Sequence, residues 1–301
     1  MAFTYTDTNI NGHTGIEISS YVGNDKKLSI PAKIDGKPVI SIGKYAFTDA
    51  CKELEEVYIP ESINTIKAFA FYFCGELRKV VLTDSVTDYY DGAFRTCSAV
   101  SDIEVTMSED HSELVHRMLN DSDRKMRVTF KFREDGSMLR LVFPEYNNNS
   151  IADPRAQTFH IRIEGSGFSY RECVRQDVLK IKEYDSLFRK AVADDNDLAI
   201  DIAVSRLMYP TRLSDSDKAA YKAHLEANIM RAAELAMEDG NEEWTEVLIH
   251  EDLLNEEALD RALQLASELK KNELISMLMD HRHEHMQAKP AAKLSLDDWE
   301  F

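Results

Sequence analysis

The residues best suited by type to chemistry are a histidine, a serine and a cysteine in the middle third of the chain: His160, Ser166 and Cys173. An imidazole can take a proton from a hydroxyl or a thiol, which then attacks an electrophile. That mechanism needs an exposed nucleophile turn and a third group to orient the base, and neither is recognisable around these positions. A hydrolase or transferase using the His160/Ser166 region is therefore the third of three functional hypotheses.

The segment Gly165-Ser166-Gly167 could also bind a phosphate, because glycines let a ligand approach the backbone closely. The segment lacks the spacing of a dinucleotide-binding fingerprint and the lysine of a P-loop. A glycine turn after a strand explains it, so we expect no cofactor here.

Cysteine and histidine side chains could hold a metal ion. Cys51, Cys74 and Cys97 recur every 23 residues, so each has the same place in a repeated unit, where a small buried thiol packs well. On a helix, His281 and His285 share a face while His283 points elsewhere. Positive charge is also favoured near a helix C-terminus. We expect no metal and no catalytic role at these positions.

A repeat in the first third of the chain could position a binding surface. The segment 54–59 recurs as 77–82 and 100–105, each time 23 residues on. One unit cannot cover its own apolar side, whereas stacked units bury a continuous core. The inward side chains are expected to be Leu28, Ile30, Val57, Ile59, Val80, Leu82, Ile103 and Val105, facing an aromatic column of Phe47, Phe71 and Phe94.

Residues 3–107 resemble the BspA-like leucine-rich repeat family. The resemblance rests on Ile-Pro, on Ala-Phe followed by Cys, and on Leu-x-x-Val at the 23-residue period. It implies a leucine-rich-repeat solenoid and a protein-binding or adhesive role, often at a cell surface. No export signal is apparent at Met1–Thr6, which departs from that pattern.

Two rows of side chains are expected on the solvent face of the repeat strands. The first row, Lys27, Glu56, Lys79 and Asp102, alternates in sign, so neighbouring charges can pair. The second row exposes an aromatic and an aliphatic side chain and is the better candidate for contact with a partner. Its members are Ser29, Tyr58, Val81 and Glu104.

Residues 108–175 are expected to form a cap helix and a small antiparallel sheet. Leu114, Val115, Met118 and Leu119 have helical spacing, and Ser108 is a candidate helix start. The segments 126–133, 139–143 and 159–163 alternate as strands do, with a loop expected at 147–150. The polar face of this sheet is either simply solvated or covers the acidic helical part of the same chain. A nucleic-acid site is the third interpretation, and it lacks interleaved aromatic residues for base stacking. The face carries Arg127, Lys131, Arg133, Arg140, His160 and Arg162.

The apolar pattern of residues 176–286 predicts helices. Two segments thirty residues apart, 229–236 and 259–266, are alike, and their alanines permit close helix packing. This region resembles an ankyrin-like array over 184–283, although the Thr-Pro-Leu-His signature is absent, so another antiparallel helical repeat stays open. Pro210 is expected to end a helix and Ser214 to start the next. The flexible tail, 287–301, ends in acidic and aromatic residues that read either as a frayed end or as a docking peptide.

Composition excludes several classes of function. The chain has 301 residues and a formal net charge of −18, which disfavours nucleic-acid binding. It has no apolar run long enough to insert into a membrane. The expected fold is α+β multidomain: a leucine-rich-repeat β-solenoid (1–107), an α+β connector (108–175), an ankyrin-like helical repeat array (176–286) and the tail. The expected function is non-catalytic protein binding by a cytoplasmic scaffold or adaptor, to a partner the sequence does not name, with a surface adhesin as the alternative.

Overall fold

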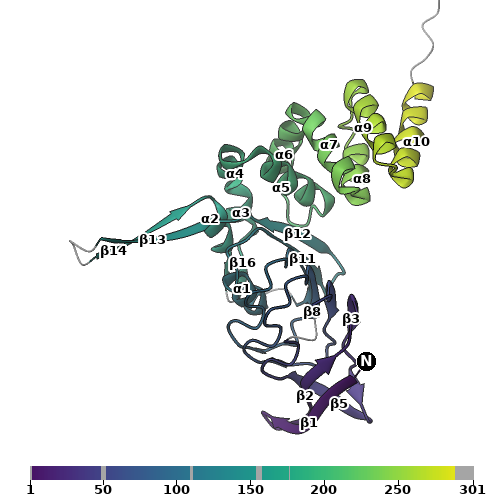
Figure 1. The fold of residues 1–301 in the computed structure, drawn as a ribbon. Coiled ribbons are helices and arrows are strands. Elements are labelled where there is room, and N and C mark those ends of the chain that lie inside the picture. The colour runs from purple at the N-terminus through teal and green to yellow at the C-terminus, as the bar shows by residue number, and fades with distance from the viewer. Residues whose placement is uncertain (1, 49–51, 109–110, 154–157, 176, 289–301) are drawn as a thin grey trace, which may run out of the picture. The chain divides into compact units, whose positions relative to one another are not determined.

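The computed structural model describes residues 2–48, 52–108, 111–153, 158–175 and 177–288 (Figure 1). They belong to two compact units, Met1–Asp217 and Lys218–Phe301. Cys51 and residues 289–301, which hold most of the expected tail, lie outside the described residues.

The first unit is built around a six-stranded sheet in the order β12-β11-β10-β8-β6-β3. The strands β3 (Lys27–Ser29), β6 (Glu56–Tyr58), β8 (Lys79–Thr83) and β10 (Asp102–Met107) pair in parallel, in the register that the 23-residue repeat predicts. All eight expected inward side chains are buried. The β-solenoid is therefore confirmed, because each turn covers the apolar side of its neighbour.

A second sheet follows the opposite side of the turns, in the order β1-β2-β5-β7-β9 with β4 beside β5. The hairpin β1 (Ala2–Ile10) and β2 (His13–Val22) is antiparallel, whereas β5 (Lys37–Ile42), β7 (Thr65–Ile66) and β9 (Asp88–Tyr89) continue in parallel. The short β4 is Lys33–Ile34.

The aromatic column forms as expected between the turns. Phe71 stacks on Phe47 and on Phe94, with centroids 4.7 Å apart in both pairs. The buried thiols of Cys74 and Cys97 donate to the carbonyls of Phe47 and Phe71, at 3.2 and 2.9 Å. These two cysteines thus have a packing role that repeats from turn to turn, as the spacing predicts.

The connector differs from the expectation in one strand. The strand β11 (Met126–Phe132) pairs in parallel with β10 and adds one more turn to the solenoid sheet, rather than starting a separate antiparallel sheet. Only β12 (Met138–Phe143) is antiparallel to β11. Alternating apolar residues suit both strand directions, and the unpaired edge of β10 accepts β11 after the chain has passed through α1 (Glu113–Asn120).

Two more expectations in this region are corrected. Helix α1 begins after Ser112, not at Ser108, although its four expected apolar residues are buried. The segment expected as a loop at 147–150 is part of β13 (Asn147–Asp153), which pairs with β14 (Thr158–Glu164) in a two-stranded hairpin (Figure 1). A run of asparagines has low strand propensity, but the ladder with β14 satisfies its backbone groups.

Short elements and helices complete the first unit. They are α2 (Gly167–Arg171), β15 (Val174–Arg175), β16 (Val178–Leu179), α3 (Ile181–Ser186), α4 (Phe188–Asp194) and α5 (Asn196–Met208). Helix α6 (Asp215–Ala227) follows, and the Ser214 hydroxyl accepts the Asp217 N–H at 3.1 Å, which confirms the helix start expected there.

Helix α5 covers the polar face of β11 and β12. The buried Asp201 carboxylate contacts Arg127 at 2.8 Å and Lys125 at 2.6 Å. Arg140 donates to the Thr129 hydroxyl at 3.0 Å. Two members of the basic sheet face, Arg127 and Arg140, therefore contact α5. Lys131 and Arg133 instead pair with carboxylates of the solenoid, and the side chains of His160 and Arg162 lie outside the described residues.

The second unit starts at Lys218 and so contains most of α6, followed by α7 (Ile229–Asp239), α8 (Glu242–His250), α9 (Glu256–Glu268) and α10 (Asn272–Ala288). The side chains of Asn241 and Asn255 cap α8 and α9. The expected close packing occurs, since α7 and α9 contact each other and both bury alanines. These alanines are Ala232, Ala233, Ala236, Ala258, Ala262 and Ala266.

Candidate functional site

The four predicted partner-binding residues lie side by side on one face of the solenoid sheet. Ser29 pairs in register with Tyr58, Tyr58 with Val81, and Val81 with Glu104. Ser29 is exposed and the other three are half-buried. We call these four residues the sheet face.

Contacts within the chain fix the polar members of the sheet face. The Tyr58 hydroxyl donates to Glu56 at 2.8 Å, and this hydrogen bond raises the pKa of Tyr58. Glu104 accepts from Lys131 at 2.5 Å and lies 3.4 Å from Lys79. Burial works to raise the pKa of Glu104, but the two ammonium groups outweigh it and the pKa is lowered. Glu104 is therefore a carboxylate whose charge is already compensated.

The neighbouring row of charges pairs only partly as expected. Lys27 contacts Glu56 at 2.8 Å across the strands, which lowers the pKa of Glu56. Lys79, however, contacts Glu104 diagonally, while Asp102 accepts from the Ser101 hydroxyl at 2.6 Å. Long lysine side chains reach diagonal neighbours as readily as direct ones, so the strand register alone did not determine this pair.

The sheet face is bounded at one end. The row continues from Glu104 to Thr129, and Thr129 is buried next to Arg140, where α5 covers the sheet. The side chains from Ser29 to Glu104 are the part left for a partner. They offer an aromatic ring and an isopropyl group among charges that are already paired, which suits binding.

The candidate nucleophiles are placed unfavourably for catalysis. Ser166 precedes α2 and is buried, and its backbone N–H donates to Asp194 at 2.7 Å. Cys173 is also buried, its thiol faces the Ser169 carbonyl at 3.6 Å, and burial raises its pKa to about 11. A raised pKa keeps the sulfur protonated, the reverse of nucleophile activation. His160 lies on β14, and its side chain is outside the described residues.

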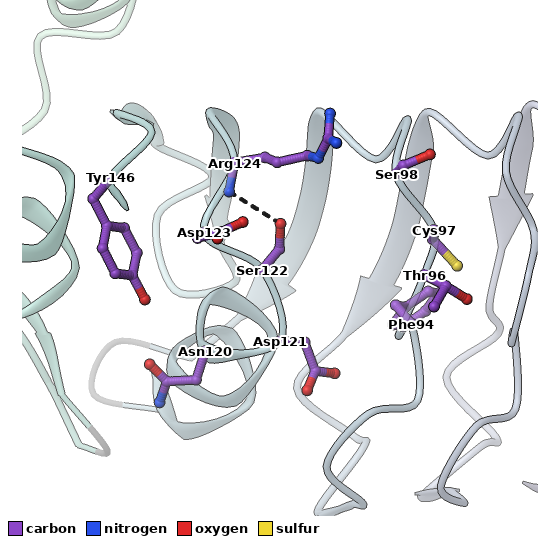
Figure 2. A pocket seen from close by; sticks show the side chains of 10 residues that line it. All are labelled: Phe94, Thr96, Cys97, Ser98, Asn120, Asp121, Ser122, Asp123, Arg124 and Tyr146. Carbon is purple, nitrogen blue, oxygen red and sulfur yellow. Dashed lines mark hydrogen bonds between the residues drawn. The ribbon is translucent and has the colours of Figure 1, made fainter. Parts of the chain in front are cut away.

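A hollow of about 430 Å³ separates the third solenoid turn from the chain after α1 (Figure 2). Figure 2 shows Phe94, Thr96, Cys97 and Ser98 on one side and residues 120–124 on the other. The Asp121 carboxylate accepts from the Tyr89 hydroxyl and, at 2.8 Å, from the Gly92 N–H. Burial raises the pKa of both Asp121 and Tyr89. Asp121 thus attaches the end of α1 to the solenoid. The sequence period does not predict this contact between Asp121 and Gly92.

No group of three His, Cys, Asp or Glu side chains with suitable geometry for a metal ion occurs in the part of the chain that the structure describes. His281 is buried on α10, and the side chain of His285 lies outside the described residues. Among the described helices, none combines the length and the apolar character that a bilayer span requires.

Comparison with known proteins agrees with the geometry of the first unit. Residues 18–131 match the family described as BspA type leucine rich repeat region, in six copies. The match supports the resemblance found in the sequence and reaches β11, the strand that the structure adds to the sheet. Leucine-rich repeats of this type are generally protein-binding modules and are generally non-catalytic. No curated protein matches the chain.

Three solved structures are similar over part of the chain. A leucine rich cell surface protein from Faecalibacterium prausnitzii is 26% identical, over 39% of this chain and 34% of that one, with a TM-score of 0.29. A leucine-rich repeat protein from Bacteroides ovatus is 24% identical, over 35% and 30%, with a TM-score of 0.27. The leucine rich repeat protein of T. pallidum is 21% identical, over 33% and 68%, with a TM-score of 0.24.

Proposed function

We propose that this chain is a non-catalytic protein-interaction module that binds a protein partner through the sheet face: Ser29, Tyr58, Val81 and Glu104. The supporting observation is the continuous register of these four residues next to charges that are already paired. A surface whose side chains are fixed before binding loses little conformational entropy when a partner arrives. Tyr58 is the expected central contact, because tyrosine is enriched among the residues that contribute most binding energy at interfaces; Val81 is its apolar neighbour in the same row.

The remaining parts of the proposal concern organisation and location. The segments 1–107, 108–175, 176–286 and 287–301 are proposed as solenoid, connector, helical array and tail. The array is proposed to be ankyrin-like, since α7 with α8 and α9 with α10 form successive helix pairs whose first helices carry the similar segments 229–236 and 259–266. We propose an intracellular scaffold or adaptor. Cell fractionation tests this, and recovery in the surface fraction would favour the adhesin.

Affinity capture with matched variants tests the sheet face. The full chain is compared with Val81→Arg and with Val22→Arg, which changes the same residue type at an exposed site on β2. We expect a saturable partner that Val81→Arg loses and Val22→Arg retains. A partner retained by both variants, or the absence of any saturable partner, would contradict the proposal.

A further inference from the structure

Four aromatic side chains gather on the surface of the solenoid, outside the buried Phe column. They are Tyr45, Phe69, Tyr72 and Phe73, and we call them the aromatic ladder. The rings of Tyr45 and Phe69 are stacked, 5.5 Å apart and 8° from parallel. Tyr72 meets both rings edge-on, at 5.9 and 5.5 Å. Tyr45 and Phe73 remain 44% and 61% exposed, so these rings contribute little to the core.

The backbone under the ladder is strained. Tyr45, Phe69 and Phe73 have φ of 60°, 60° and 63°, in the left-handed region. At the position equivalent to Phe69, the next turn has Gly92, with φ of 79°. Glycine adopts this conformation freely, whereas a residue with a Cβ is destabilised by it. Tyr45 and Phe69 thus keep a ring at a position where glycine would relieve the strain, and burial does not explain the exposed rings.

Two cations flank the ladder. The Lys44 ammonium lies 5.1 Å from the Tyr45 ring centroid and 5.7 Å from that of Phe69. The aliphatic stem of Arg95 lies near the Phe69 ring, because a Cβ built on Gly92 would be 3.2 Å from the Phe69 ring and 3.6 Å from the Cβ and Cδ of Arg95. Among the described residues, neither cation is within ion-pair distance of a carboxylate. In a chain with a net charge of −18, this is a local surface that favours an anionic partner.

We propose that the aromatic ladder, with Lys44 and Arg95, is a second binding surface, specific for an acidic peptide segment of a partner protein that carries an aromatic side chain. Carboxylates of the peptide pair with the two cations, and its aromatic ring packs on the exposed rings. Carboxylate recognition next to a rigid aromatic surface combines specificity with affinity. The ladder shares no residue with the sheet face, so the two proposals stand independently.

Peptide selection on the full chain tests this surface. A phage-displayed library of random short peptides is panned on the wild-type chain, and the selected peptides are synthesised for fluorescence anisotropy. We expect them to be rich in Asp, Glu and aromatic residues. The double variant Lys44→Glu/Arg95→Glu and the single variant Tyr45→Gly are expected to bind at least about tenfold more weakly. Val178→Ala, at an exposed position that belongs to neither proposed surface, is expected to bind as the wild type does.

The variant Tyr45→Gly separates binding from stability, because it removes a ring and also relieves the left-handed strain. Its melting temperature is expected to equal or exceed that of the wild type. A clear fall in melting temperature would assign the ladder to stability and overturn the proposal. Selection of peptides without acidic residues, equal binding by the double variant, or a dimer of the chain that the double variant dissociates would overturn it as well.

Discussion

Arg206 and Asp185 form a two-pronged ion pair from which water is excluded. The Nε–Oδ1 distance is 2.8 Å and the Nη2–Oδ2 distance is 3.0 Å, and the two side chains are 0% and 1% exposed. Arg206 also donates to the carbonyls of Tyr209 and Thr211. The pair therefore joins α5 to α3 and holds the chain that leaves α5.

Removing one member of this pair is expected to be costly. In Asp185→Asn the guanidinium stays charged and buried, so the free energy of unfolding should fall by about 3–5 kcal/mol. Replacing both residues by apolar ones, Arg206→Met with Asp185→Leu, should recover most of that loss. Urea denaturation followed by circular dichroism measures both, and an equal loss in the single and double variants would contradict this account.

The contact of Asp201 with Arg127 and Lys125 holds α5 on the sheet. Asp201→Asn keeps the shape but removes the charge, leaving two cations beside a buried amide. We expect the free energy of unfolding to fall by about 2–4 kcal/mol, since the carboxylate is buried while its partners are partly solvated. The matched control is Glu113→Gln, which breaks the exposed ion pair with Arg117 and should change stability by about 0.5 kcal/mol or less. Similar losses in the two variants would be inconsistent with a buried anchor.

Two neighbouring phenylalanines should differ strongly in what their truncation costs in stability. Phe71 is fully buried and stacked on both sides, so Phe71→Ala should lower the free energy of unfolding by about 3–5 kcal/mol. Phe73 is largely exposed, so Phe73→Ala should lower it by less than about 1 kcal/mol. Thermal denaturation of the two variants makes the comparison. Comparable destabilisation would show that the Phe column is not the core.

Cys173 should be unreactive in the folded protein. Burial raises its thiol pKa from the ordinary 9.0 to about 11, which lowers the thiolate population near neutral pH by about 100-fold. Alkylation by iodoacetamide at pH 8, followed on the Cys173 peptide by mass spectrometry, should therefore be at least about 100-fold slower in native protein than in urea.

The same shift makes stability depend on pH. The folded state holds the Cys173 proton more tightly than the unfolded state, so its contribution is complete below pH 9 and is lost as the pH rises toward 11. Cys173→Ala should flatten the stability profile over that interval. Rapid native alkylation, or a profile unchanged in the variant, would contradict the assignment.

The solenoid was predictable from the sequence because every turn buries its apolar side against an equivalent turn. Val57 and Val80 occupy equivalent inward positions, and Phe71 and Phe94 do so in the aromatic column. Aliphatic, aromatic and cysteine positions all recur every 23 residues, and such a shared period is typical of a fold built from stacked repeats. The burial of Cys74 and Cys97 followed from the same argument, because each thiol has the same place in its turn.

In the connector, the sequence pattern predicted strands but not their direction. The alternation of Val128 and Phe130 is identical in parallel and antiparallel strands, so only the free edge of β10 determined that β11 extends the solenoid. The choice between Asp102 and Glu104 as partner of Lys79 depended on side-chain reach, which the register does not specify.

The amino-acid sequence by itself determined which side chains face the core of the solenoid and where its turns repeat, because burial of apolar surface acts on local, periodic patterns. Only the tertiary structure decided that Asp201 lies against Arg127 and that Asp121 attaches α1 to the third turn. These contacts join residues far apart in the chain through single side chains, and no period in the sequence records such pairs.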